Sequence, residues 1–140
     1  MAIIYYPSLS NGDVVDVQFL KPDGDVVFKT LLVDSGFTGQ SCFILSQDAT
    51  DLSHAAASAS RTTGALEGMQ NRELVVCRIP ALAFQRAMIA IITDISSLAL
   101  PIGVEGMAGL RFLRHFVRWG AELTTDGSWR FFLSNSEEEL

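Results

Sequence analysis

The sequence predicts a single all-β domain, folded as a closed barrel or a sandwich. Six or more short apolar segments, rich in β-prone residues, are separated by turns that contain glycine, proline or aspartate. Only one segment, residues 110–119, has the spacing of apolar residues that is typical of a regular helix. With 140 residues and no linker or internal repeat, the chain is expected to form one domain over residues 1–140.

The N-terminal third is expected to consist of strands joined by turns. An apolar, β-prone run stops at Pro7, and residues 14–20 alternate loosely as a strand. Residues 22–25 (Pro-Asp-Gly-Asp) form a hairpin turn, from which residues 26–33 return as the second strand. After a loop, residues 42–45 form a further short strand.

The middle of the chain is less regular. Between Ser46 and Ser60 the apolar pattern is lost, and an aspartate there could cap a short helix through residues 55–57. Residues 74–77 then form a strand that ends at Pro80. One or two strands follow, from Phe84 and from residues 87–92.

The C-terminal third contains the predicted helix and a last hairpin. Leu110, Leu113 and Val117 share one side of the helix, with Phe112 and Phe116 beside them. Its opposite face is charged, and we expect it to be solvated; it consists of Arg111, Arg114, His115 and Arg118. Strands at residues 121–124 and 129–133 bracket an Asp-Gly turn.

Composition and charge exclude some classes of function. Apolar residues make up 49% of the chain and charged residues 19%, as in a globular protein. The net charge of −6 disfavours nucleic acid as a partner. Part of this charge is the run Glu137-Glu138-Glu139, so we expect residues 134–140 to be a frayed acidic tail.

We expect a cytoplasmic protein without a membrane partner. The first seven residues contain no basic side chain and no long apolar run, so no signal peptide is predicted. The apolar stretch 81–104 is interrupted by Arg86, Asp94 and Pro101, which disfavours a membrane span.

No cofactor or metal is predicted. Neither His54 nor His115 has a cysteine or a second histidine at ligand spacing. Cys42 and Cys77 are too few for a disulfide framework, although one bond between them remains open. Because both lie in apolar strands, we expect buried, inert thiols.

The segment with the most chemical information ends the strand at residues 26–33. Three apolar residues lead into Asp34, Ser35 and Gly36. A carboxylate that leaves an apolar strand loses hydration unless nearby donors stabilise its charge. The Ser35 hydroxyl, and a glycine that tolerates positive φ and close backbone approach, could provide this. Taken alone, Asp-Ser-Gly is more often a simple turn than an acid–base site.

A second segment changes that balance. Residues Met107-Ala108-Gly109 form an apolar-apolar-glycine element directly before the predicted helix. Together with Asp34-Ser35-Gly36 about seventy residues earlier, this order resembles the retropepsin-like aspartic proteases. The motif Asp-Ser-Gly-Phe-Thr-Gly is most similar to that of small single-domain bacterial members. The resemblance covers roughly residues 14–133.

The resemblance implies a closed acid-protease barrel with a flap hairpin and one short C-terminal helix. It also implies an aspartic endopeptidase that acts on a peptide or protein substrate, with Asp34, Ser35 and Gly36 in the catalytic loop. The flap would lie near residues 64–69. Residues that would contact the substrate in the flap and loop are Phe37, Thr38, Ala65, Leu66, Glu67, Gly68 and Met107.

Such chemistry needs two carboxylates that share a proton, and the chain contains one Asp-Ser-Gly. The second Asp34 would therefore come from another copy, which predicts a homodimer through the active site. Tyr5, Tyr6 and the strand at residues 129–133 are candidates for an interface sheet, or equally for ordinary packing within one chain.

Two departures from the family affect the site. Retroviral members often carry an acid and an arginine that form an ion pair where this chain has Thr38 and Leu110, so the loop must be braced in another way. Arg111 stands where the family often has Asp or Asn. These differences keep a second hypothesis open, a peptide-binding or dimerisation module of the same fold with little or no catalysis.

Overall fold

The structure is a computed structural model, in which residues 2–62 and 68–135 are described. The strands are β1 (Ile3–Pro7), β2 (Val14–Leu20), β3 (Val26–Asp34), β4 (Phe43–Ser46), β5 (Ala55–Thr62), β6 (Gly68–Ile79), β7 (Phe84–Thr93), β8 (Gly106–Gly109), β9 (Arg118–Leu123) and β10 (Trp129–Ser134). The helical segments are η1 (Gln47–Leu52), η3 (Pro80–Leu82), η4 (Ser96–Leu98) and α1 (Leu110–Leu113). The chain is therefore mostly β, as its sequence predicts.

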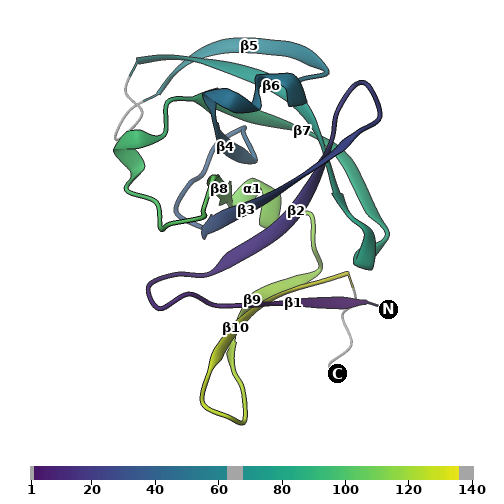
Figure 1. Cartoon of the computed structure of the whole chain (residues 1–140), viewed down its shortest axis with the longest axis vertical. Coiled ribbons are helices and arrows are strands. Elements are labelled where there is room, and N and C mark those ends of the chain that lie inside the picture. The colour runs from purple at the N-terminus through teal and green to yellow at the C-terminus, as the bar shows by residue number, and fades with distance from the viewer. Residues whose placement is uncertain (1, 63–67, 136–140) are drawn as a thin grey trace.

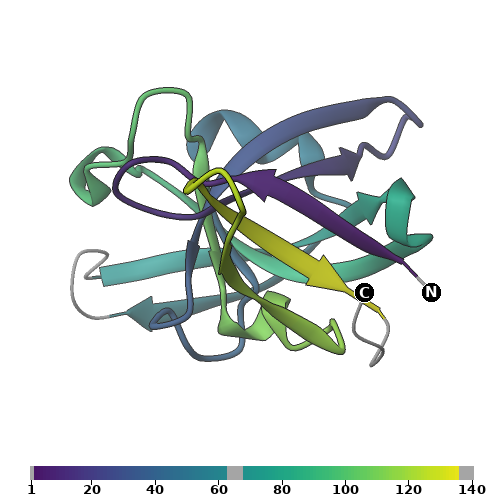
Figure 2. The same ribbon diagram turned by 90° about the horizontal axis from the view of Figure 1, so that it is seen from below.

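Six of the strands form a closed barrel (Figure 1). Their order is β2-β3-β8-β4-β7-β6, and pairing of β6 with β2 closes the ring. β5 extends this sheet by pairing with the N-terminal half of β6, which makes a long antiparallel hairpin. The C-terminal ends of β3 and β5 lie toward the same side of the molecule as the loop after β7, as Figures 1 and 2 show.

The two ends of the chain meet in a separate three-stranded sheet, in the order β1-β10-β9 (Figure 2). Within it, β1 and β10 pair antiparallel from Ile3 with Ser134 to Pro7 with Arg130. Tyr6 is buried against the barrel, whereas Tyr5 is partly exposed beneath the Arg130 guanidinium. The terminal strands thus pair within one chain, and Tyr6 belongs to its core.

Aromatic side chains fill the barrel. Phe43 lies between Phe19 and Phe112, with ring centroids 5.2 and 5.1 Å away, and all three are fully buried. Because each buried aromatic ring removes a large apolar area from water, these side chains contribute strongly to the stability of the fold. A smaller apolar cluster of Ile44, Ile91 and Met107 is covered by residues of the loop between β7 and β8.

The predicted helix at residues 110–119 is wrong in its length. The regular helix ends at Leu113, and β9 begins at Arg118. The backbone amide of Val117 donates to the Ser134 carbonyl, so β10 draws this segment into a sheet. Phe116 is nevertheless buried, with its ring 4.8 Å from that of Phe84. The apolar residues of this segment are therefore buried partly from α1, which is one helical turn long, and partly from the turn that follows it.

The short helix expected at residues 55–57 is also wrong. These residues begin β5, where Ala55 pairs with Leu74, while a 3-10 helical segment, η1, precedes them and buries Ala49 and Leu52. A run of small residues has a weak helical stripe, and pairing with the long strand β6 overrides it. Phe84 and residues 87–92, in contrast, belong to the single strand β7.

Candidate functional site

Asp34 is the last residue of β3, and it lies beside Gly109, the last residue of β8. The two strands run parallel, with Leu32 opposite Met107 and Asp34 opposite Gly109. β8 also pairs with β4, so the end of β3 is anchored within the barrel wall. The two motifs that carry the family resemblance are therefore hydrogen-bonded neighbours.

The loop after β3 holds the Asp34 side chain by local hydrogen bonds. The Gly36 amide donates to Asp34 Oδ1 over 2.9 Å, and the Phe37 amide donates to the Asp34 carbonyl over 3.1 Å. The Asp34 side chain is half-buried, while Ser35 and Gly36 are exposed. The Asp34 Oδ1 atom therefore accepts a hydrogen bond from the loop, while the residue stays partly accessible to solvent.

The role expected for glycine in this loop divides between two positions. Gly36 has no positive φ, and a Cβ there would lie 3.1 Å from Asp34 Oδ1, so it matters for close approach. Positive φ, which favours glycine, occurs instead at Gly39 (φ 116°). Of the two properties of glycine named for Gly36, close approach is therefore used there, and positive φ is used three residues later at Gly39.

Backbone hydrogen bonds and one ring brace the loop. The Leu110 amide donates to the Phe37 carbonyl over 3.0 Å, and the Gly109 amide donates to the Cys42 carbonyl over 2.9 Å. A Cβ on Gly109 would lie 2.5 Å from the Phe37 ring and 2.7 Å from the Phe37 carbonyl oxygen. Phe37 thus packs directly on the glycine, and this contact needs no ion pair.

The predicted substrate-contacting residues have different surroundings. Thr38 is exposed, Phe37 is half-buried, and Met107 is buried beneath the loop in the cluster with Ile44 and Ile91. Gly68 begins β6 and pairs with Thr62. The remaining residues expected in the flap, Ala65, Leu66 and Glu67, lie outside the described residues.

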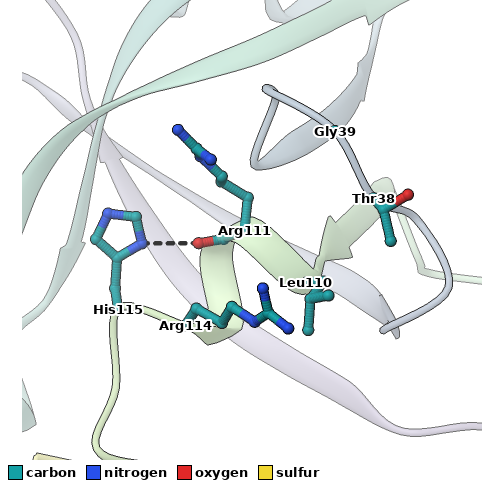
Figure 3. Close-up of a pocket in the computed structure, with 6 residues that line it drawn as sticks. All are labelled: Thr38, Gly39, Leu110, Arg111, Arg114 and His115. Atoms are coloured by element: carbon teal, nitrogen blue, oxygen red, sulfur yellow. Dashed lines mark hydrogen bonds between the residues drawn. The ribbon is translucent and has the colours of Figure 1, made fainter.

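An open pocket of about 390 Å³ lies beside this loop (Figure 3). Thr38 and Gly39 of the loop line it, together with residues from α1 and the turn that follows: Leu110, Arg111, Arg114 and His115. Thr38 and Leu110, the positions of the family's ion pair, thus line one pocket. His115 Nδ1 lies 2.9 Å from the Arg111 carbonyl, which fixes the ring against α1.

The sequence did not indicate that this pocket exists. Arg111, Arg114 and His115 were expected on a solvated helix face, and each is indeed exposed. What the helical spacing could not show is that this face borders the loop after Asp34. The signal that could have found it is the resemblance itself, because the two positions that it compares with an ion pair, Thr38 and Leu110, would lie close together in the fold.

The two cysteines are buried and free. Burial raises the pKa of Cys42 to about 11, and the charge of Arg111 opposes this shift only in part. Burial, with a smaller contribution from Cys42, also raises the pKa of Cys77. Both pKa values lie above neutral pH, which favours the protonated thiols, and the prediction that both cysteines are buried is confirmed.

Asp94 directly follows the last residue of β7, and it provides a useful comparison with Asp34. Its Oδ1 accepts a hydrogen bond from the Ser96 amide over 2.9 Å, two residues on, as Asp34 accepts one from Gly36. This bond lowers the pKa of Asp94. Asp94 lies in a turn directly after its strand, so the local hydrogen bond alone does not distinguish Asp34.

Within residues 2–62 and 68–135, no group of three metal-ligating side chains is close enough to hold an ion. In the same part of the chain, no helix has the length and apolar character needed to cross a membrane. Comparison of the sequence and the structure with protein-family models, curated proteins and solved structures found no match.

Proposed function

We propose that the chain is an aspartic endopeptidase with a retropepsin-like fold, whose active site forms between two copies of the chain. The observation that carries the proposal is the placement of Asp34. Its carboxylate ends a barrel strand, accepts a hydrogen bond from Gly36 and lies beside Gly109 of a second, parallel strand. The two sequence motifs of the proposed family therefore come together in one loop site.

The second carboxylate is proposed to be Asp34 of the other copy. The chain contains one Asp-Ser-Gly sequence, and Ser35 and Gly36 are exposed, so this loop has a free surface for another loop to face. A two-fold axis through the loop would bring identical residues together, as a self-complementary interface requires. The exposed Ser35 hydroxyl could then donate across that axis.

Two such carboxylates would act as a pair. Adjacent like charges cannot both ionise at low cost, so the pair would hold one proton over a mildly acidic range. The ionised carboxylate would take a proton from a water molecule as that water attacks the peptide carbonyl. The protonated carboxyl would polarise the carbonyl oxygen, and the pair titrates as one unit.

The β5–β6 hairpin supports the substrate part of the proposal. It extends from the barrel toward the same side as the end of β3 (Figure 1). A hairpin in this position could cover an extended peptide and exclude water from the reacting bond. We therefore propose that it is the flap.

The test is cleavage of a peptide library between pH 4 and 7 by the wild-type chain and by Asp34→Asn. We expect cleavage by the wild type, with a maximum at mildly acidic pH, and a loss of at least about a thousandfold in Asp34→Asn. Asp94→Asn is the matched control, because it makes the same change in a similar strand-end turn. It should retain wild-type activity.

The outcomes separate the proposal from its alternative. Equal residual cleavage by wild type and Asp34→Asn, or no cleavage by a verified dimer, would contradict the protease. Peptide binding by such an inactive dimer would instead favour the binding or dimerisation module. Circular dichroism of each variant shows whether it is folded.

A further inference from the structure

The pocket beside the Asp34 loop is cationic in a protein that is acidic as a whole. Three cationic or protonatable side chains line it, Arg111, Arg114 and His115, and the other lining residues, Thr38, Gly39 and Leu110, carry no charge. The chain has a net charge of −6. A local concentration of positive charge against this background favours an anionic ligand at this position.

The two guanidinium groups have no partner in the described part of the chain. Neither Arg111 nor Arg114 forms a side-chain hydrogen bond or an ion pair with residues 2–62 or 68–135. Lys21, Lys29 and Arg130, in contrast, each lie within 4 Å of a carboxylate. The donors of Arg111 and Arg114 are therefore available to a ligand.

Their arrangement suits a carboxylate. In Figure 3, Arg111 of α1 and Arg114 of the following turn extend in different directions, and Arg114 points toward Leu110. The planar guanidinium has donors in a fixed fork that matches the two oxygens of a carboxylate. The pocket, at about 390 Å³, has room for an acidic side chain or for the end of a peptide.

The pocket borders the loop that carries Asp34. Thr38 and Gly39 follow Asp34 in the same loop, and the Leu110 amide is bonded to the Phe37 carbonyl between them. An extended peptide advances about 3.3 Å per residue. A peptide bound across Asp34 could therefore place a group only a few residues from the reacting bond in this pocket.

We infer that Arg111 and Arg114 select a carboxylate of the peptide ligand, a few residues from the bond at Asp34. The carboxylate is an Asp or Glu side chain or the C-terminal carboxylate of the peptide. This inference rests on the proposed function in one respect, that the ligand of the Asp34 site is a peptide. Arg111 and Arg114 are specificity-determining residues and take no part in the reaction.

The test measures binding separately from cleavage. Fluorescein-labelled nonapeptides with an apolar centre carry one Glu, moved through every flanking position, and each is paired with the same peptide containing Gln. Both sets are made with a free and with an amidated C-terminus. Their binding to the Asp34→Asn chain is followed by fluorescence anisotropy.

We expect one position, or the free C-terminus, to bind about three- to tenfold more tightly than its uncharged partner, as for a charge-assisted bond at an exposed site. Arg111→Gln or Arg114→Gln should remove most of this preference. Arg86→Gln is the matched control, because Arg86 is exposed, loses the same charge and lies over the Phe84 ring outside the pocket. It should leave the preference unchanged.

Charge reversal gives an independent result. In Arg111→Glu/Arg114→Glu, a peptide with Lys at the selected position should bind more tightly than the Glu peptide. The inference is overturned if Glu and Gln peptides bind equally or not at all, or if the pocket variants keep the wild-type preference.

Cleavage of the same peptides by the wild-type chain keeps the two proposals distinct. Selective binding that depends on Arg111 and Arg114 but leads to no cleavage supports the carboxylate pocket and overturns the protease. Cleavage that depends on Asp34, without any preference for an acidic peptide in binding, supports the protease and overturns the carboxylate pocket.

Discussion

Gly109 sets the distance between the Asp34 loop and the barrel. Its φ of −99° is open to any residue, so its importance lies in space and not in backbone freedom. The Phe37 ring and carbonyl occupy the volume that a side chain would need. A glycine at this position is what allows β8 and the loop after β3 to lie in contact.

Gly109→Ala is expected to destabilise the fold by about 2–3 kcal/mol, because the new methyl group meets both a ring and a backbone oxygen. Gly120→Ala is the matched control, because a Cβ at Gly120 would lie 3.6 Å from the nearest atom, which is in the Phe132 ring, and this is an ordinary contact distance. That variant should change the free energy of unfolding by less than about 1 kcal/mol. Urea unfolding measures both, and equal effects would contradict the proposed packing.

The turn between β9 and β10 contains the carboxyl group with the largest downward pKa shift among the described residues. Hydrogen bonds from the Ser128 hydroxyl, the Thr124 hydroxyl and the Ser128 amide hold the pKa of Asp126 at about 2. Because the pKa is depressed on folding, this turn adds stability above the ordinary pKa of an aspartate. That contribution is lost as pH falls from about 4 toward 2.

Ser128→Ala is therefore expected to raise the pKa of Asp126 toward its ordinary value and to remove part of this acid-dependent stability. Titration of the carboxyl carbon by nuclear magnetic resonance measures the shift directly. Ser53→Ala, which removes a hydroxyl that donates to Glu73 elsewhere, is the control and should leave Asp126 unchanged. An unchanged Asp126 pKa in Ser128→Ala would contradict the assigned cause.

At the scale of elements, the segment after β8 differs most from its predicted form. The sequence predicts a helix with Val117 facing inward, whereas Val117 is 50% exposed and Phe116 is 6% exposed. The Phe116 ring packs between Phe84 and Phe112. The two arrangements therefore differ in the place of Val117, whereas Phe116 belongs to the apolar side in both.

Phe116→Ala should cost about 3 kcal/mol of unfolding free energy, as is usual for loss of a buried aromatic ring. Val117→Ala should cost less than about 1 kcal/mol, because its side chain is half-exposed and its backbone hydrogen bond remains. The comparison uses urea unfolding of both variants. A larger effect at Val117 than at Phe116 would contradict this arrangement and favour the continuous helix over residues 110–119.

Much of the fold could be predicted because local patterns decide it. The hairpin turn at residues 22–25, the strand that Asp34 ends and the last hairpin follow from turn residues and alternation. The end of α1 could not, because it depends on an amide of Val117 and a carbonyl of Ser134, seventeen residues apart. The loop site could be proposed from its two motifs, but the pocket required the contact between Leu110 and Phe37.

For the whole molecule, the central claim is that one chain holds half of an active site. The barrel is complete without a partner, since β2–β6 pairing closes it, and the terminal strands pair within the chain. Dimerisation is therefore proposed to complete the chemistry and not the fold. Sedimentation at micromolar concentration should detect the dimer, and a strictly monomeric chain with a peptide inhibitor bound would contradict it.

The most direct measurement is the activity of mixed dimers. Wild-type and Asp34→Asn chains are mixed at constant total concentration, allowed to exchange, and assayed for peptide cleavage. If each site needs Asp34 from both chains, an equal mixture should retain about one quarter of the wild-type activity, because only that share of dimers is fully wild type. Mixtures with Asp94→Asn should keep full activity. Retention of one half would show that each chain works alone, and would contradict the shared site.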